Sequence, residues 1–377
     1  MNYELTEEQE LLRRTVRDFA ETRVAPVAEE LDREERFPYE LVQEMAELGF
    51  MGIPFAEQYG GTGADTLSYA IAIEELTRID SSVAITVAAH TSLGTMPIYL
   101  YGTDEQKQQW LPQLASGDKL AAFGLTEANA GSDAGATRTR AELRDGEWII
   151  NGSKMFITNA GTDITSCVTI TAVTGDDEIS NIIVPNGTPG YEISAPLKKL
   201  GWHASDTREL SFKDCAVPEG NLLGPRGKGF HQFMEILDGG RISVAAMGVG
   251  LAQGAYDLAF AYAKEREQFG RPIAKFQAVQ FALADMATEI EAGRQLVYRA
   301  AWLKDQGKDF GLAAAQAKLY TGLLSNRAAN AALQIHGGYG FMEEYAISRL
   351  YRDQKILEIG EGTNEVQRMV IGKLLGL

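Results

Sequence analysis

The stretch VTITAV at residues 168–173 alternates apolar residues with threonines, and this period of two predicts a half-buried β-strand. Asp145-Gly146 separates two shorter runs, 137–143 and 147–150, and this dipeptide is a strong signal for a two-residue hairpin turn. Further turn residues crowd this part of the chain, with no helical pattern between them. The middle third is therefore expected to be an antiparallel barrel or sandwich rather than a parallel nucleotide-binding sheet.

Helical patterns lie on both sides of this β segment. On the N-terminal side, residues 6–9 have the form of a capping box, and apolar residues follow at helical spacing. On the C-terminal side, apolar residues from Phe276 to Ala300 recur every three or four positions, as in bundled helices. Further helices are expected over residues 312–335, 345–357 and 364–374. The sequence predicts an α+β multidomain chain, with an N-terminal helical domain (1–118), a middle antiparallel β domain (119–228) and a C-terminal four-helix-bundle domain (229–377).

Composition excludes several classes of function. With 45% hydrophobic and 23% charged residues over 377 positions, the chain is globular. A net charge of −17 makes nucleic acid and membrane surfaces poor partners. Two isolated cysteines, Cys167 and Cys215, and four scattered histidines predict neither a disulfide scaffold nor a metal site. The first residues lack a signal or transit pattern, so we expect a cytoplasmic protein, or a mitochondrial-matrix one if a transit peptide was removed.

Three glycines, Gly248, Gly250 and Gly254, have a spacing similar to that of a dinucleotide-binding fingerprint. That fingerprint requires a preceding strand, whereas these glycines lie inside an apolar helical run. Close packing of helices through small residues is therefore the favoured interpretation, and NAD binding is not.

Two other motifs carry polar groups at the ends of predicted strands. Residues 123–133 read FGLTEANAGSD, and residues 156–159 read FITN, which adds an aromatic ring beside a hydroxyl. Taken alone, the first motif is most often an ordinary surface loop. Together, the two segments can face a flat heterocycle that accepts hydrogen bonds.

Motifs along almost the whole chain now allow a family to be recognised. The sequence resembles the acyl-CoA dehydrogenase family, and the match is specific because the motifs occur in the same order over this length. The motifs are Leu125–Glu127, Ala130–Asp133, Phe156–Asn159, Ser205–Arg208, Leu237–Arg241, Arg266–Gly270, Gln334–Gly338 and Glu361–Glu365.

The resemblance implies FAD, bound non-covalently between the β domain and the C-terminal helices of a homotetramer. By position, the isoalloxazine and ribityl groups would contact Phe123, Leu125, Thr126, Ser132, Phe156 and Thr158. The adenosine and pyrophosphate would contact Arg266, Phe269, Gln277, Gln334, Gly337 and Gly338, partly from a neighbouring subunit, and Thr363 and Glu365 are also assigned to the cofactor. Without the motif, Arg266 would be read as half of a surface ion pair.

The resemblance also implies that Glu361 is the catalytic base. It follows an apolar stretch and precedes a predicted helix start, a setting that can desolvate its carboxyl group and raise its pKa. Without the motif, a glutamate there is simply a favourable charge at a helix N-terminus. The CoA thioester would contact Ser132, Asp206, Thr207, Asp238, Arg241 and Gly362. For Arg241, pairing with Asp238 inside a helix is the alternative.

The implied reaction is the α,β-dehydrogenation of an acyl-CoA to a trans-2-enoyl-CoA, as in fatty acid β-oxidation, with electrons passing to an electron-transfer flavoprotein. The isovaleryl branch carries its base where this chain has Gly240, and the glutaryl branch carries an arginine where it has Ala84. Gly360 replaces the aromatic residue that many relatives have before the base. A straight, short-to-medium acyl chain is expected. The alternatives are a flavoprotein lyase or desulfinase, an oxidase, or a non-catalytic binding protein on the same scaffold.

Overall fold

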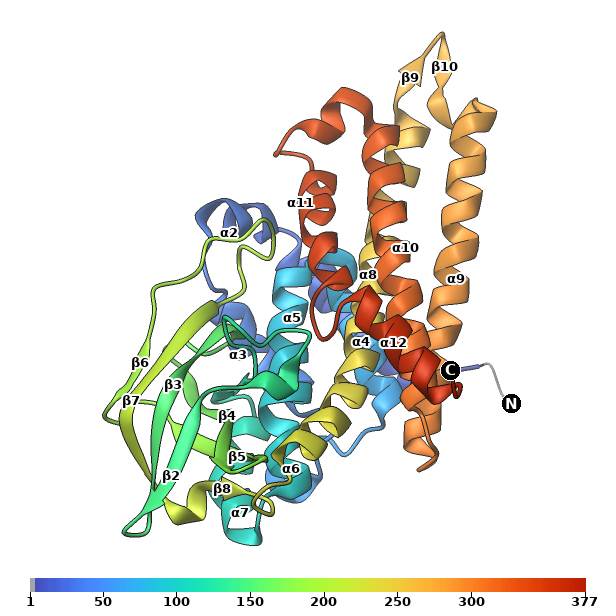
Figure 1. Cartoon of the computed structure of the whole chain (residues 1–377). Helices are drawn as coiled ribbons and strands as arrows, with labels where there is room; N and C mark the ends of the chain where they lie inside the picture. Colours follow the sequence, from blue (N-terminus) through green and yellow to red (C-terminus); the bar gives the residue numbers. More distant parts are fainter. Residues whose placement is uncertain (1–3) are drawn as a thin grey trace.

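The computed structural model describes residues 4–377 and shows helices on either side of a β domain in sequence (Figure 1). The N-terminal helices are α1 (Glu7–Phe19), α2 (Ala28–Glu34), α3 (Tyr39–Glu47), α4 (Thr66–Ile79), α5 (Ser81–Ala89), α6 (Met96–Tyr101) and α7 (Asp104–Ala115). The predicted capping box is confirmed at the start of α1. Thr6 Oγ1 accepts from the N–H of Gln9, and Gln9 Oε1 accepts from the N–H of Thr6.

The middle segment folds into one sheet. Its strands are β1 (Leu120–Gly124), β2 (Arg140–Arg144), β3 (Glu147–Thr158), β4 (Thr165–Gly175), β5 (Glu178–Pro185), β6 (Tyr191–Ile193), β7 (Thr207–Pro218) and β8 (Leu222–Leu223). The order is β6-β7-β3-β2-β4-β5-β8, and β1 joins at β4. The predicted hairpin is confirmed, because β2 and β3 pair antiparallel across Asp145 and Gly146, whose φ angles are 51° and 83°.

The sheet departs from antiparallel order at β4. This strand runs parallel to β1, and also to β2 at a single residue pair. A parallel neighbour needs a long connection, which the chain supplies by making the β2–β3 hairpin between β1 and β4. No helical crossover is therefore required.

The C-terminal segment is dominated by long helices, α8 (Gly229–Glu265), α9 (Gln277–Asp305) and α10 (Gly311–His336), followed by α11 (Ala346–Asp353) and α12 (Asn364–Leu374). A small hairpin, β9 (Glu267–Gln268) and β10 (Arg271–Pro272), joins α8 to α9. The helix predicted over 345–357 is divided, because α11 ends at Asp353 and a 3-10 segment, Gln354–Glu358, continues from it.

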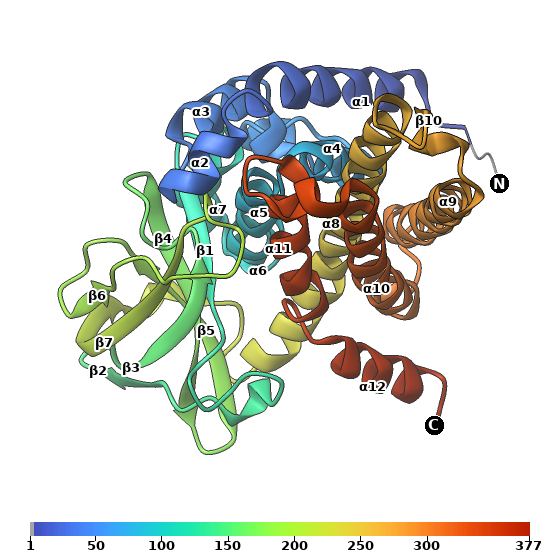
Figure 2. The ribbon, with the colours of Figure 1, turned by 90° about the horizontal axis from the view of Figure 1, so that it is seen from above.

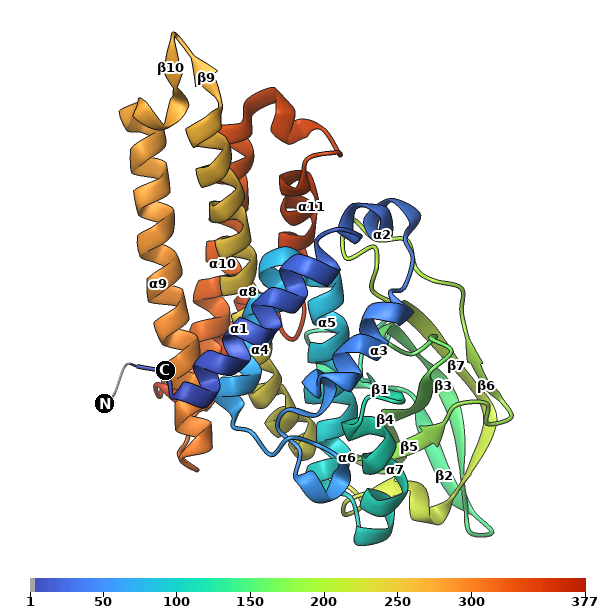
Figure 3. The ribbon, with the colours of Figure 1, turned by 180° about the vertical axis from the view of Figure 1, so that it is seen from behind.

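The two helical segments share a single hydrophobic core although the β domain separates them in sequence. One cluster of buried side chains extends from Val16 in α1 to Leu357 after α11, and a separate cluster fills the β domain. Figure 2 shows the β domain to one side of this helical body, and Figure 3 shows α1 lying across it.

The three glycines of α8 explain how closely its neighbours approach. A Cβ built on Gly250 or Gly254 would lie 2.3 Å or 2.1 Å from a carbonyl oxygen of α4, and one on Gly248 would lie 2.7 Å from Cβ of Thr321 in α10. Close packing through small residues is thereby confirmed. Ser81–Tyr101 and Gly229–Glu265 are long and apolar enough to cross a bilayer by composition, but 78% and 67% of their most apolar windows are buried inside the protein.

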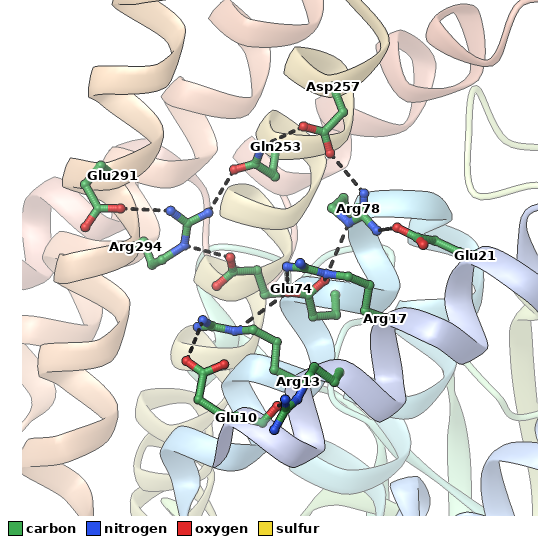
Figure 4. A network of polar contacts seen from close by, with 12 residues as sticks. Glu10, Arg13, Arg17, Glu21, Glu74, Arg78, Gln253, Asp257, Glu291 and Arg294 are labelled. Atoms are coloured by element: carbon green, nitrogen blue, oxygen red, sulfur yellow. Dashed lines mark hydrogen bonds and ion pairs between the residues drawn. The ribbon is translucent and has the colours of Figure 1, made fainter. Parts of the chain in front are cut away.

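A polar network ties α1 to the helices beneath it (Figure 4). Arg294 of α9 donates from Nε to Glu74 of α4 at 2.8 Å, while Arg17 of α1 donates to Glu75 at 2.7 Å and 2.9 Å. Arg78 of α4 donates to Asp257 of α8 at 3.0 Å. Burial raises the pKa of Glu74, and Arg294 acts against that shift. The network therefore pairs the buried carboxylates of Glu74 and Glu75 with arginines from α9 and α1.

Candidate active site

Glu361 lies in the turn between the 3-10 segment Gln354–Glu358 and α12. Its backbone is left-handed, with φ of 51°, and Gly362 follows at 92°. The side chain reaches α8, where a Cβ built on Gly240 would lie only 2.3 Å from its Oε2. Oε2 is enclosed and has no hydrogen-bond partner among residues 4–377. The turn thus directs a carboxyl group inward, onto bare helix backbone.

Burial raises the pKa of Glu361 to about 7, with the positive charges of Lys318 and Arg241 acting in the opposite direction. A carboxylate with this pKa is a far stronger base than a solvated one, yet it is still substantially ionised at neutral pH. The site therefore contains a group suited to proton abstraction.

Two buried side chains hold the turn in place. Gln367 of α12 donates from Nε2 to the carbonyl oxygens of Glu361 at 3.3 Å and Gly362 at 3.0 Å. Lys318 of α10 donates to the same Gly362 oxygen at 2.7 Å. The sequence interpretation overlooked both residues, and their positions on helices gave no motif that could reveal them.

The other predicted residues of this turn have simple local roles in the structure. Thr363 caps α12 by accepting from the N–H of Val366 at 3.3 Å. Glu365 is exposed and pairs with Arg368 at 3.3 Å. Their assignment to the cofactor stays a prediction.

The predicted isoalloxazine residues lie on β1, on β3 and on the loop between β1 and β2. Phe123 is buried and stacks on Phe233 of α8, with ring centroids 5.5 Å apart. Phe156 is 63% exposed and has a left-handed φ of 61°. Leu125, Thr126 and Thr158 are partly buried, and Ser132 is exposed. An aromatic side chain held outward on a strained backbone is typical of a residue that contacts a ligand.

A buried ion pair supports the loop that carries Leu125, Thr126 and Ser132. Lys154 of β3 donates to Glu127 Oε1 at 2.7 Å and to the Leu125 carbonyl at 3.2 Å. The sequence interpretation did not single out Lys154. The strand pattern did contain a signal. Lys154 lies an even number of positions after Trp148 and Ile150 on the same strand, and all three side chains are buried.

The predicted thioester contacts are mostly occupied by protein groups. Asp206 accepts from the N–H of Gly161 at 2.7 Å and from Arg208, and Thr207 pairs with Thr158 in the sheet register. Asp238 bonds to Arg241 within α8, which is the pairing that sequence analysis gave as the alternative. The Arg241 Nε is nevertheless buried and has no hydrogen-bond partner in the described part of the chain. Their roles toward substrate stay predictions.

A second group of predicted residues lies at the other end of α8 and α10. Arg266, Gly337 and Gly338 line a cavity of about 590 Å³, together with Gln268 and Tyr339 among others. The Arg266 guanidinium lies over the Tyr339 ring, 5.2 Å from its centroid. Across residues 4–377 it has no carboxylate within 4.0 Å, so the surface ion pair considered from the sequence does not form.

The remaining members of this second group are exposed. Phe269, at the hairpin between β9 and β10, is 93% exposed with φ of 53°. Gln277 and Gln334 are exposed at the start of α9 and near the end of α10. Arg266 follows Arg241 by 25 positions along α8, which corresponds to roughly 37 Å of helix. Within one chain, the residues near Arg241 and those near the β9–β10 hairpin therefore lie too far apart to contact each other (Figure 1).

Three family models match the chain in succession. They are the acyl-CoA dehydrogenase N-terminal domain over residues 6–118, the middle domain over 122–215 and the C-terminal domain over 227–376. The chain is 53% identical over 380 residues to the probable acyl-CoA dehydrogenase YngJ of Bacillus subtilis, covering 100% of each.

Solved structures agree over the same length. Butyryl-CoA dehydrogenase from Megasphaera elsdenii superposes with a TM-score of 0.97 at 45% identity, covering 100% of both chains. A chain from a structure titled for the electron transferring flavoprotein of Acidaminococcus fermentans gives a TM-score of 0.98 at 47% identity, covering 100% of this chain and 99% of that one.

Proposed function

Because the chain belongs to the acyl-CoA dehydrogenase family, we propose that it converts an acyl-CoA thioester to the trans-2-enoyl-CoA, with FAD as cofactor and an electron-transfer flavoprotein as acceptor. The observation that carries this proposal is the Glu361 carboxyl group, turned inward against Gly240 with Oε2 enclosed and unpaired. An ordinary structural glutamate would have a partner in such a position.

The residues present fit a flavin. Phe156, Phe269 and Glu361, which the resemblance assigns to cofactor and base, all have left-handed backbones. Such strain costs about 1 kcal/mol or more at each position and concentrates at functional sites. Gly337 and Gly338 border the cavity beside Arg266, and a Cβ built on either would meet no atom of the described residues within 4 Å. That space can admit a pyrophosphate close to the backbone, within reach of a guanidinium group.

The chain's own contribution to the chemistry is to remove the α-proton and to stabilise the charge that develops on the thioester. Glu361 takes the α-proton, and its pKa of about 7 narrows the gap to the weakly acidic α-carbon. Hydrogen bonds from Gln367 and Lys318 fix the turn through its carbonyl oxygens. The Glu361 N–H, which has no backbone acceptor among residues 4–377, would donate to the thioester oxygen. FAD, held by the residues assigned to it above, would supply the acceptor for the β-hydrogen, which leaves as a hydride.

We infer a straight, short-to-medium acyl chain as substrate. Gly240 has no room for a second carboxylate beside Glu361, since even a Cβ there would overlap Oε2. Ala84 is fully buried and supplies no cation for a distal carboxylate. Butyryl-CoA dehydrogenase among the similar structures supports a short chain.

The distance between the two groups of predicted cofactor residues supports a homo-oligomer, for which we propose a tetramer. In such an assembly, Arg266 and the exposed Phe269 of one subunit would complete the cofactor site of its neighbour. We further propose a cytoplasmic location, with neither membrane nor nucleic acid as partner. Sedimentation of the flavin-loaded protein tests the assembly, and a monomeric holoprotein would contradict it.

The function is tested by anaerobic mixing with butyryl-CoA or hexanoyl-CoA. The yellow protein should bleach and yield one enoyl-CoA for each reduced flavin, while Glu361→Gln keeps the colour and does not bleach. An eliminated group among the products would favour the lyase or desulfinase alternative. Hydrogen peroxide formed in air would indicate an oxidase. A protein that no thioester bleaches would be left with a binding role.

A further inference from the structure

Lys318 lies in the middle of α10, and its side chain is completely buried. Its Nζ donates to the carbonyl oxygen of Gly362 at 2.7 Å. In the part of the chain that the structure describes, residues 4–377, no carboxylate oxygen lies within 4.0 Å of that Nζ. Burying an ammonium group without a contacting counter-ion is costly, so this lysine calls for an explanation.

The charges around the turn come from several elements. From α8, Arg241 faces the site and is already paired with Asp238. Glu358 precedes the turn and pairs with Lys355, while Glu365 of α12 pairs with Arg368 at the surface. The phenol of Tyr69 in α4 is buried, and the charge of Glu361 contributes to raising its pKa. Among these groups, Glu361 acts most strongly on Lys318 and serves as its counter-charge.

We propose that Lys318 is a positioning residue for proton abstraction, which fixes the Glu361–Gly362 turn through the Gly362 carbonyl and favours the ionised form of Glu361 with its charge. The proposal rests on the proposed function, because it gives that function's base a second, buried support. In the step itself, the α-C–H bond breaks and an O–H bond forms on Glu361. The electron pair left on the α-carbon forms the α,β double bond as the β-hydrogen departs as a hydride, for which the flavin would be the acceptor. Lys318 neither gives nor takes a proton.

The direction of the effect follows from the charges. Burial raises the pKa of Glu361, and Lys318 and Arg241 act against that shift. Burial lowers the pKa of Lys318 to about 8, so its ammonium is still charged at neutral pH. With a neutral side chain at position 318, only Arg241 would oppose the effect of burial on the pKa of Glu361. We expect the pKa of Glu361 to rise by about one unit, since nearby opposite charges shift carboxyl groups by about that much or more.

Gln367 separates the role of charge from the role of geometry. It donates to the same Gly362 oxygen, at 3.0 Å, and to the Glu361 oxygen, at 3.3 Å, but carries no charge. Gln367→Leu therefore loosens the turn and leaves the electrostatics around Glu361 in place. Lys318→Met removes both one hydrogen bond and the charge. The two variants form a matched pair.

The experiment measures the pH dependence of flavin bleaching by butyryl-CoA in a single turnover, for the flavin-loaded wild type and both variants. For Lys318→Met, the midpoint of the acid limb should move up by about one pH unit, which is tenfold less ionised base at a pH well below the midpoint. For Gln367→Leu, the plateau rate should fall while the midpoint stays. Infrared difference spectra against Glu361→Gln give the carboxyl titration directly, without turnover.

The outcomes are distinguishable. An unshifted midpoint in Lys318→Met, or an equal shift in Gln367→Leu, would overturn the proposal. Should Lys318→Met fail to retain flavin, Lys318→Gln keeps a donor at that position and removes only the charge, and the same shift is required of it. If none of the thioesters tested bleaches the wild-type flavin, the proposed function fails. The carboxyl titration midpoints from the infrared spectra then still decide the role of Lys318.

Discussion

Gly240→Ala should separate the position of the Glu361 carboxyl group from the stability of the fold. The added Cβ would lie 2.3 Å from Oε2, whereas ordinary contacts begin near 3.4 Å. The carboxyl group must therefore retreat by about 1 Å, and a misplacement of that size can cost about 10²-fold in rate. The same substitution stabilises a helix interior by about 1 kcal/mol. We expect a large loss of rate in a protein that is no less stable.

The assay is single-turnover bleaching by butyryl-CoA, combined with thermal unfolding of the same sample. Gly239→Ala is the matched control. Within residues 4–377, a Cβ at Gly239 would meet only Nζ of Lys304, at 3.2 Å, and that atom ends a flexible side chain. The control gains the same helix propensity and should keep the wild-type rate.

Two results would refute the reasoning. If Gly240→Ala bleaches within a few-fold of the wild-type rate, either the Glu361 carboxyl group is not seated on α8 or it is not the base. If Gly240→Ala loses its flavin while Gly239→Ala keeps it, the substitution disturbs more than the carboxyl group, and the expectation that it moves only Glu361 is wrong.

Three further predictions concern stability and pH. Because the pKa of Glu361 is raised to about 7, its buried charge destabilises the fold increasingly from about pH 4.5 to 7. Glu361→Gln should therefore raise the free energy of unfolding, measured with urea, by up to about 3 kcal/mol at pH 8 and leave it unchanged at pH 4. Equal gains at both values would contradict this. Gly254→Ala puts a Cβ 2.1 Å from the Arg78 carbonyl and should lower stability by about 1–3 kcal/mol, so an unchanged Tm would argue against the close α4–α8 contact. Arg294→Met leaves Glu74 buried without its cation and should lower the free energy of unfolding by about 3–5 kcal/mol. Adding Glu74→Leu should recover most of that loss. A double variant as unstable as the single one would contradict this explanation.

Local signals in the sequence were sufficient for individual elements. The capping box at Thr6 needs only four residues, and the Asp145-Gly146 hairpin needs only a dipeptide that tolerates positive φ. The helical period located α9, α10 and α12 for a similar reason. Each of these features is decided by neighbours in sequence.

Long-range features could not be read in this way. Nothing in the composition of β4 shows that it pairs in parallel with β1, because the partner is chosen by the sheet as a whole. Lys318 and Gln367 are unremarkable helix residues until α10 and α12 meet the Glu361 turn. The base itself was identified through its motif, whereas its seat on Gly240 required the assembled helices.

The common core of the two helical segments has a consequence for synthesis on the ribosome. From the end of α4 at Ile79 to the start of α8 at Gly229, about 150 residues must be translated, which takes roughly 8 to 30 s at ordinary elongation rates. During that interval the apolar surfaces of α4 and α5 that pack against α8 in the folded protein have no partner. A nascent chain stalled within the β domain should therefore bind holdase chaperones more strongly than one released after α10.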